Sequence, residues 1–157
     1  MSDERTQGRI EAIFVTSEAG APMRSVDAVD AVTEQGLAGD RYQHDAGTFS
    51  GKPSPKQQVT LIEWEAIEAV RRDYGLELEP AKTRRNLLTR GLALNHLVGA
   101  TFRVGDAVFE GLELCEPCGH MEGLSGVEGA RKALVHRGGL RCRVVEGGRI
   151  AVGDAAG

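Results

Sequence analysis

Apolar and polar residues alternate in several short runs along the chain, and this period of two predicts β-strands. The clearest pair covers residues 101–104 and 107–114, and Gly105-Asp106 between them is typical of a two-residue hairpin turn. Gly147-Gly148 predicts a similar hairpin between residues 140–146 and 149–152. We also expect strands at residues 9–16, 26–32 and 58–61, so the pattern favours a β-rich fold.

A spacing of three or four between apolar residues predicts one helix with clear ends, over residues 60–74. The apolar residues at this spacing are Leu61, Trp64, Ile67, Val70 and Tyr74. Thr60 and Glu63 fit a capping box at the start of this helix, and Gly75 supplies the stop at its end. A second helical pattern covers residues 126–136, and residues 92–97 fit one helical turn.

Many short strands, two helices and no regular alternation of strand and helix define the expected fold class. We predict a mixed α/β, β-rich fold, in which a β-barrel or a strongly bent mixed sheet carries a few peripheral helices. A doubly wound α/β sheet is not expected. Because 157 residues are the length of one ordinary domain, we expect a single domain over residues 1–157.

Charge and composition exclude several classes of protein. The net charge of -4 argues against general nucleic-acid binding, which normally needs a basic excess. No apolar run approaches the roughly 18 residues of a membrane span, and the polar residues 1–9 do not resemble a signal peptide. We therefore expect a cytoplasmic protein that is not membrane-bound, whose three cysteines are reduced thiols.

The densest reactive chemistry lies at Cys115, Cys118 and His120, where the strand pattern ends. A structural zinc site normally needs four ligands, and the sequence offers one Cys-x-x-Cys pair. A redox dithiol would stand at a helix N-terminus, and the acidic Glu116 would oppose thiolate formation there. The third interpretation is one working thiolate, Cys118, with Cys115 as a structural neighbour and His120 as a group that stabilises the thiolate.

Three further features of the sequence bear on the site. Lys82, Arg84 and Arg85 form a cationic cluster beside an apolar, strand-like segment, so at least one of these arginines is expected to be held against the structure. Residues 43–56 form a long loop, and such loops are commonly functional. Cys142 lies inside the strand predicted for residues 140–146, so we expect it to be a small buried hydrophobic residue.

Short motifs along the chain, taken in their order and spacing, resemble the MOSC domain, the module at the C-terminus of eukaryotic molybdenum cofactor sulfurases. They are Gly39-Asp40-Arg41, Arg85-Asn86-Leu87 before Gly91, Gly105-Asp106, Glu116-Pro117-Cys118, Arg137-Gly138-Gly139-Leu140-Arg141 and Gly153-Asp154. The resemblance covers about residues 9–154. The sequence departs from the family pattern at Tyr42, where the family usually has a histidine.

The resemblance implies a β-barrel-centred fold with a pocket for molybdenum cofactor (molybdopterin) or for a sulfur species. It makes Cys118 the reactive residue, which would either carry a persulfide or coordinate molybdenum. Arg41, Arg85 and Asn86 match positions where the family places pocket residues, and Arg137 joins them as a candidate cofactor-binding residue. A soft thiolate suits molybdenum and sulfane sulfur, and arginine forks suit a phosphate.

Two classes of function follow. The first is sulfur transfer or molybdenum-dependent reduction of N-hydroxylated compounds, with a sulfur-donor or reductase protein as partner. The second is a non-enzymatic β-barrel that binds or delivers a ligand, with a structural or zinc-binding Cys-x-x-Cys corner; whether the protein is an enzyme is therefore open. We expect no pyridoxal phosphate, because the sequence contains no desulfurase domain of the kind that precedes the module in fused sulfurases.

Overall fold

The structure, a computed structural model, describes residues 8–18, 20–42, 58–117 and 119–157, and for His120 it describes the backbone alone. Its largest sheet has the strand order β11-β7-β8-β9-β5-β6-β1-β2. The strands are β1 (Gly8–Val15), β2 (Arg24–Val26), β5 (Val59–Glu63), β6 (Leu87–Arg90), β7 (Thr101–Val104), β8 (Ala107–Leu114), β9 (Leu140–Glu146) and β11 (Ala155–Ala156).

The sheet closes into a seven-stranded barrel because β11 pairs with both β7 and β1. Most neighbouring strands are antiparallel, and β5 and β6 form a parallel pair. A cluster of buried Ile, Val, Leu and Phe side chains fills the barrel. Within it Phe102 and Phe109 pack edge to face, with their ring centroids 6.2 Å apart. The expected β-rich, barrel-centred fold class is therefore confirmed.

A second, three-stranded sheet packs beside the barrel and is formed by β3 (Ala28–Val32), β4 (Gly36–Leu37) and β10 (Gly148–Ala151). This sheet corrects two predictions. The strand expected at residues 26–32 is split, so that β2 pairs with β1 in the large sheet while β3 pairs with β10. The expected hairpin between β9 and β10 is wrong, because β10 pairs with β3 instead.

The glycines at positions 147 and 148 do not form the predicted hairpin turn, and their lack of a side chain is needed for another reason. A Cβ on Gly147 would lie 2.6 Å from the carbonyl oxygen of Ala31, and one on Gly148 would lie 2.5 Å from that of Asp106. These distances leave no room for a side chain. The glycines therefore let the chain pass close to two other backbones as it crosses from one sheet to the other.

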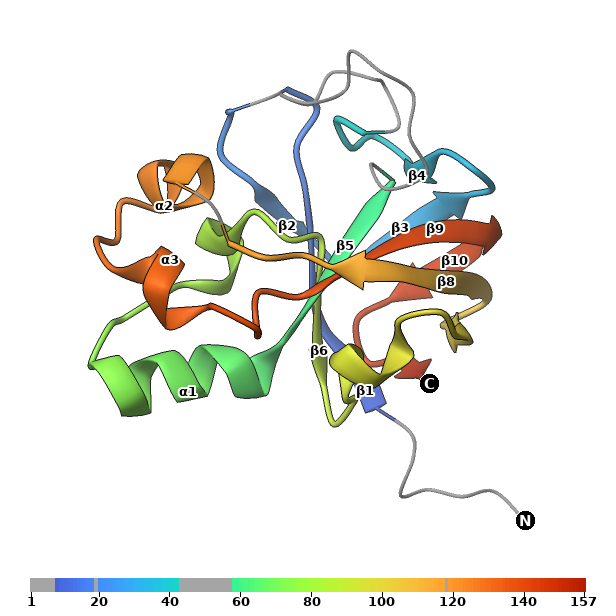
Figure 1. Cartoon of the computed structure of the whole chain (residues 1–157). Helices are drawn as coiled ribbons and strands as arrows, with labels where there is room; N and C mark the ends of the chain where they lie inside the picture. Colours follow the sequence, from blue (N-terminus) through green and yellow to red (C-terminus); the bar gives the residue numbers. More distant parts are fainter. Residues whose placement is uncertain (1–7, 19, 43–57, 118) are drawn as a thin grey trace.

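The helices gather on the opposite side of the barrel from the second sheet (Figure 1). They are α1 (Trp64–Tyr74), α2 (Gly119–Ser125) and α3 (Ala130–Ala133), with the 3₁₀ turn η2 (Pro80–Thr83) against α2. A second 3₁₀ turn, η3 (Leu94–Leu97), lies apart from them against the barrel strands β5 and β8. A separate apolar cluster fills the space between these helices and the barrel. None of the described helices has the length and apolar character that crossing a bilayer requires.

The first helix starts later than its apolar spacing predicts. Residues 60–63 belong to β5, and Glu63 makes no side-chain capping hydrogen bond, so the predicted capping box is wrong. The backbone N–H of Thr60 donates to the side-chain oxygen of Asn86 at 3.1 Å, which ties this segment to the sheet. The predicted end is correct, because Gly75 adopts a left-handed conformation (φ 66°) as the C-cap.

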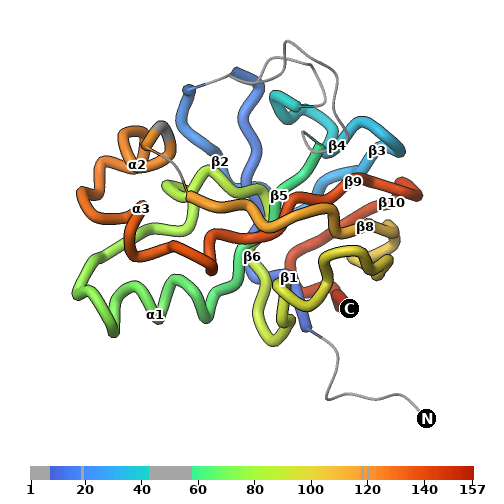
Figure 2. The backbone as a smooth tube through the Cα atoms, viewed as in Figure 1, coloured from blue at the N-terminus to red at the C-terminus, as the bar shows by residue number. Residues whose placement is uncertain are grey.

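The second helical pattern, at residues 126–136, gives only the four-residue α3. Gly126 and Gly129 have φ values of 70° and 92°, which an α-helix does not allow. The Oε1 atom of Glu122 accepts hydrogen bonds from the backbone N–H groups of Gly129 and Arg131 and so fixes the start of α3. The tube in Figure 2 shows the chain winding from α2 through this break into α3.

Candidate functional site

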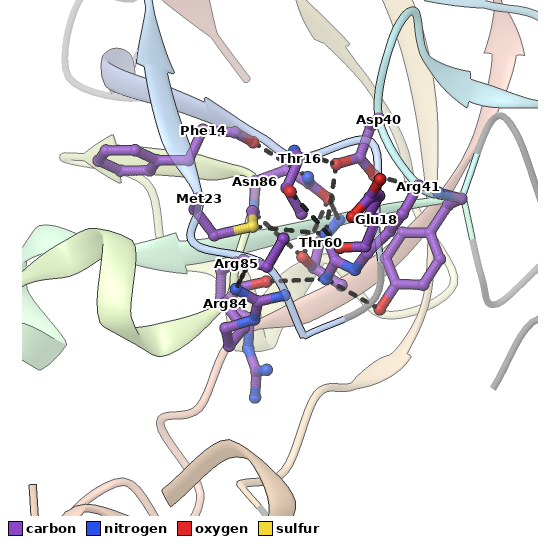
Figure 3. A network of polar contacts seen from close by, with 12 residues as sticks. Phe14, Thr16, Glu18, Met23, Asp40, Arg41, Thr60, Arg84, Arg85 and Asn86 are labelled. Atoms are coloured by element: carbon purple, nitrogen blue, oxygen red, sulfur yellow. Dashed lines mark hydrogen bonds and ion pairs between the residues drawn. The ribbon is translucent and has the colours of Figure 1, made fainter. Parts of the chain in front are cut away.

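The candidate site lies at the end of the barrel where β1 and β8 end and where β6 and β9 begin. The antiparallel register sets Ile13 opposite Leu87 and Leu114 opposite Leu140, so the segments that follow or precede these residues meet. They are residues 16–18 and 20–23, residues 84–86, the Cys115–Pro117 corner and the glycines at 138 and 139. Residues 40–42 join the same place from the second sheet (Figure 3).

Asn86 is fully buried, and its side chain bonds to two strands. Its Oδ1 atom accepts hydrogen bonds from the backbone N–H of Thr60 (3.1 Å) and from the hydroxyl of Thr60 (3.2 Å). Its Nδ2 atom donates to the carbonyl of Phe14 at 3.1 Å. The side chain that the family resemblance assigned to the pocket is therefore bonded to β1 and β5.

Arg41 and Asp40 form a buried ion pair at 3.2 Å. Arg41 also donates to the carbonyl of Arg84 (3.3 Å) and the sulfur of Met23 (3.5 Å), and its guanidinium lies 4.3 Å from the ring centroid of Tyr42. The carboxylate of Asp40 accepts a further hydrogen bond from the backbone N–H of Thr16. This pair thus fixes the segment after β1 against residue 84.

Arg85 is buried, and three backbone carbonyls bind its guanidinium. Nε donates to Gly138 (2.8 Å), Nη2 to Cys115 (3.0 Å) and Nη1 to Thr83 (3.3 Å). Among the described residues no carboxylate lies within ion-pair distance of it. The side chain therefore holds the two strand ends of the cysteine corner together and leaves one positive charge there.

Arg84 adopts a left-handed backbone conformation, with φ at 68°. Its Nη1 atom donates to the carbonyl of Ala21, and its half-buried guanidinium has no ion-pair partner among the described residues. Burial, and then the charge of Arg41, lowers the pKa of Arg84 below its ordinary value. A second unneutralised guanidinium therefore stands next to Arg41.

Two of the three cysteines lie in the described part of the chain, and both are buried free thiols, with 1% (Cys115) and 0% (Cys142) of their surface exposed. Burial, and then the neighbouring Cys115, raises the pKa of Cys142 far above its usual range. The thiol of Cys142 is therefore not available as a thiolate at neutral pH. The burial predicted for Cys142 is confirmed.

The side chain of Arg137 contacts α1 and α3. Its Nη1 atom pairs with Asp73 at 3.2 Å, Nε donates to the carbonyl of Ala133, and the guanidinium lies 6.0 Å from the ring centroid of Tyr74. These contacts join α3 to the end of α1. Among the described residues, no hydrogen bond or ion pair joins the guanidinium of Arg137 to Arg41 or Arg85.

Cys118, the residue on which the sequence analysis centres, lies outside the described residues, and so does the side chain of His120. The predicted loop at residues 43–56 is also outside them. The described neighbours of Cys118 are Pro117, which is buried, and Gly119, the exposed first residue of α2. The roles of Cys118 and His120 therefore stay predictions from the sequence.

A separate groove of about 930 Å³ lies between α1, η2 and α2. Trp64, Leu76 and Val127 contribute apolar surface to it, and Arg71 and Lys82 contribute charge. Of the predicted site residues that the structure describes in full, Arg41, Arg85, Asn86 and Arg137, none lines this groove.

The sequence model of the MOSC domain family matches residues 42–156. This chain belongs to the MOSC domain family. The comparison with curated proteins finds no match. The MOSC segment includes Arg84, Arg85, Asn86 and the whole cysteine corner, while Asp40 and Arg41 precede it by one or two residues.

Solved structures share the fold of this MOSC domain. The YuaD protein of Bacillus subtilis superposes with a TM-score of 0.77 at 15% identity, covering 96% of this chain and 94% of its own. YiiM of Escherichia coli gives 0.66 at 20% identity, covering 94% of this chain and 68% of its own. YiiM of Geobacillus stearothermophilus superposes with a TM-score of 0.70 at 14% identity, covering 95% of this chain and 73% of its own. At these identities the likeness concerns the fold.

The contacts made by Asp40 and Arg84 in this MOSC domain were not predicted from the sequence. Asp40 stands inside a motif that was quoted for the family, but nothing in a single sequence says that its carboxylate is buried. Arg84 was one of three cations in a run, and a run of charge does not show which member is held inward. The one signal in the sequence was Pro80, which is typical of the start of a helical turn. The 3₁₀ turn that begins there ends at Thr83, and Arg84 follows it in a left-handed conformation.

Proposed function

We propose that this MOSC domain binds molybdenum cofactor or a sulfur species at the cysteine corner, with Cys118 as the reactive thiolate. Sulfur transfer, or molybdenum-dependent reduction of N-hydroxylated compounds, is the activity that we propose for it. A sulfur-donor or reductase protein would be its partner. We also propose that residues 1–157 form one domain.

The observation that carries the proposal is the position of Arg85. Its buried charge has no carboxylate partner among the described residues, and it is bonded to the carbonyl of Cys115, three residues before Cys118. A nearby positive charge lowers the pKa of a thiol and so favours the thiolate that sulfur or metal chemistry needs. Arg84 adds a second unneutralised charge next to Arg41.

The donor groups present fit the proposed cofactor in kind. Guanidinium groups bind phosphate through forked hydrogen bonds, and a thiolate is a suitable ligand for molybdenum. When bound, the cofactor would supply the redox chemistry of molybdenum. The residues of the chain would bind its phosphate and supply the thiol at Cys118.

The test is to purify the protein anaerobically and to measure molybdenum, zinc and cyanide-labile sulfur per chain. We expect molybdenum or labile sulfur in the wild type and neither in Cys118→Ala. Cys115→Ser is the matched control, because it changes the other thiol of the same corner and should keep the load. Absence of both molybdenum and labile sulfur from the wild type would exclude the proposal. One zinc per chain, lost in Cys115→Ser, would favour the structural corner instead.

A further inference from the structure

The three buried or half-buried arginines of the site differ in how many of their N–H groups the protein already uses. All three guanidinium nitrogens of Arg85 donate to backbone carbonyls. Both terminal nitrogens of Arg41 are engaged, by Asp40 and Met23 on one side and by Tyr42 and the carbonyl of Arg84 on the other. Arg84 differs from both, because among the described residues only its Nη1 atom has an acceptor, the carbonyl of Ala21.

The unused edge of Arg84 has the geometry of an oxyanion binder. Its Nε and Nη2 atoms form one side of the planar guanidinium, and this pair of parallel N–H groups matches two oxygens of a phosphate. The Nη1 atom on the other side is held by Ala21. A guanidinium that is already fixed loses little conformational freedom when it binds an anion. The hydrogen bond to Ala21 therefore increases the affinity for the anion and also sets the orientation in which it binds.

The electrostatics point to the same class of ligand. Arg41, Arg84 and Arg85 carry three positive charges, and Asp40 is the one carboxylate that pairs with them among the described residues. The protein as a whole carries a net charge of -4, so the local excess of positive charge is specific to this place. The positive charges of Arg41 and Arg84 repel each other. An anion bound to Arg84 would offset this repulsion.

The backbone fixes Arg84 in this place. Its left-handed conformation (φ 68°) ends the 3₁₀ turn η2, with its N–H bonded to the carbonyl of Ala81. Its own carbonyl accepts a hydrogen bond from Arg41. A non-glycine residue in this conformation is strained, so arginine here has a cost that glycine would avoid. Figure 3 shows Arg84 with Arg41 and Met23 around the segment that follows β1.

From these observations we infer that Arg84, supported by Arg41, is the anion-binding residue of this site, and that its ligand carries a phosphate or a similar tetrahedral oxyanion. Arg85 is a positioning residue that acts through the backbone of the corner. The inference deepens the proposed function, and it rests on that function only for the identity of the molecule that carries the oxyanion.

The test is a ³¹P NMR titration of the protein with inorganic phosphate and, separately, with glycerol phosphate, at an ionic strength held constant with chloride. Arg84→Gly removes the guanidinium and suits the left-handed backbone, so the variant should fold, and circular dichroism checks this. We expect Arg84→Gly to weaken binding about 10-fold or more, and Arg84→Lys to lose less. Arg131→Ala, which removes an exposed arginine on α3, should bind as the wild type does.

Two outcomes would overturn the inference. One is that folded Arg84→Gly binds both phosphates as tightly as the wild type, and the other is that the wild type shows no saturable binding of either. Binding of inorganic phosphate alone would support the site with a free oxyanion as ligand, and tighter binding of glycerol phosphate would support a phosphate ester.

The proposed function can fail separately. The load of molybdenum or labile sulfur and the affinity for phosphate are measured independently, both on the wild type and on Arg84→Gly. If the wild type carries neither molybdenum nor labile sulfur but Arg84→Gly still loses phosphate binding, the inference stands and the proposed function fails. If the cofactor is present and Arg84→Gly changes neither its load nor phosphate affinity, the inference fails alone.

Discussion

Asn86 and Arg85 are neighbours in the chain, and both are bonded mainly to the backbone of other segments. Asn86 connects β1 and β5, while Arg85 connects the two strand ends of the cysteine corner. The family resemblance places pocket residues at these positions, and a single sequence cannot distinguish a side chain that binds a ligand from one that holds the pocket wall. Both types are polar, and both can be buried, as these two side chains are.

The side chain of Asn86 gives a prediction about stability. Asn86→Ala would leave the buried N–H of Thr60 and the carbonyl of Phe14 without their side-chain partner, so we expect a loss of about 2–4 kcal/mol in the free energy of unfolding. Urea denaturation measures it. Asn95→Ala is the matched control, because Asn95 is exposed and makes one hydrogen bond to His136. A similar loss in both variants would contradict this role.

Asp73 gives a prediction about pH. Its hydrogen bonds with Arg72 and then with Arg137 lower the pKa of its carboxyl to about 2. Because the folded-state pKa lies below the ordinary value, the stabilising effect is complete above about pH 4 and is lost as the pH falls toward 2. NMR titration of the carboxyl should show a larger upward shift of the pKa in Arg72→Ala than in Arg137→Ala. A wild-type Asp73 that titrates near pH 4 would be inconsistent with the contacts.

At the scale of the elements, strands with clear alternation were predictable and the connections between them were not. The strands at residues 101–104 and 107–114 have the predicted bounds, and their hairpin is confirmed. The start of α1 was missed because residues 60–63 are apolar enough for either a helix or a strand, and pairing with β6 and β9 decides between them. The partner of β10 was missed because a Gly-Gly step permits a crossing as well as a turn.

The glycines of the corner give a prediction at this scale. A Cβ on Gly138 would overlap the carbonyl oxygen of Cys115 and come within 2.9 Å of Pro117, so Gly138→Ala should displace the corner and destabilise the protein by about 1–3 kcal/mol. Gly123→Ala is the control, since a Cβ there meets nothing within 4 Å and should stabilise α2 by about 0.5–1 kcal/mol. Thermal unfolding of the two variants measures both effects. Equal melting temperatures would show that the corner tolerates the side chain.

At the scale of the whole molecule, the barrel brings together segments that are far apart in the sequence. Five groups of residues meet at one end, and no pattern within any one of them shows this; they are 16–18 with 20–23, 40–42, 84–86, 115–117 and 138–139. The class of fold followed from strand count and turn spacing. The closure of the barrel depends on β11, which has only two residues and gives no strand signal by itself.

The short closing strand gives a prediction for the whole barrel. Removal of residues 155–157 would eliminate the pairing of β11 with β1 and β7, including hydrogen bonds between Arg103 and Gly157 and between Gly105 and Ala155. We expect a loss of about 2–4 kcal/mol in the free energy of unfolding. Chemical denaturation of the truncated chain tests this, and an unchanged midpoint and slope would show that the barrel does not need the strand for stability.

The central claim is that Cys118 is a working thiolate beside unneutralised guanidinium groups, and the pH dependence of its alkylation tests this most directly. Cys115 and Cys142 are buried, so iodoacetamide should modify one thiol per native chain, which peptide mapping assigns to Cys118. We predict that its reactivity rises with a midpoint well below the usual thiol pKa of about 8.5. A midpoint at or above 8.5, or a native protein in which Cys118 does not react, would contradict the account.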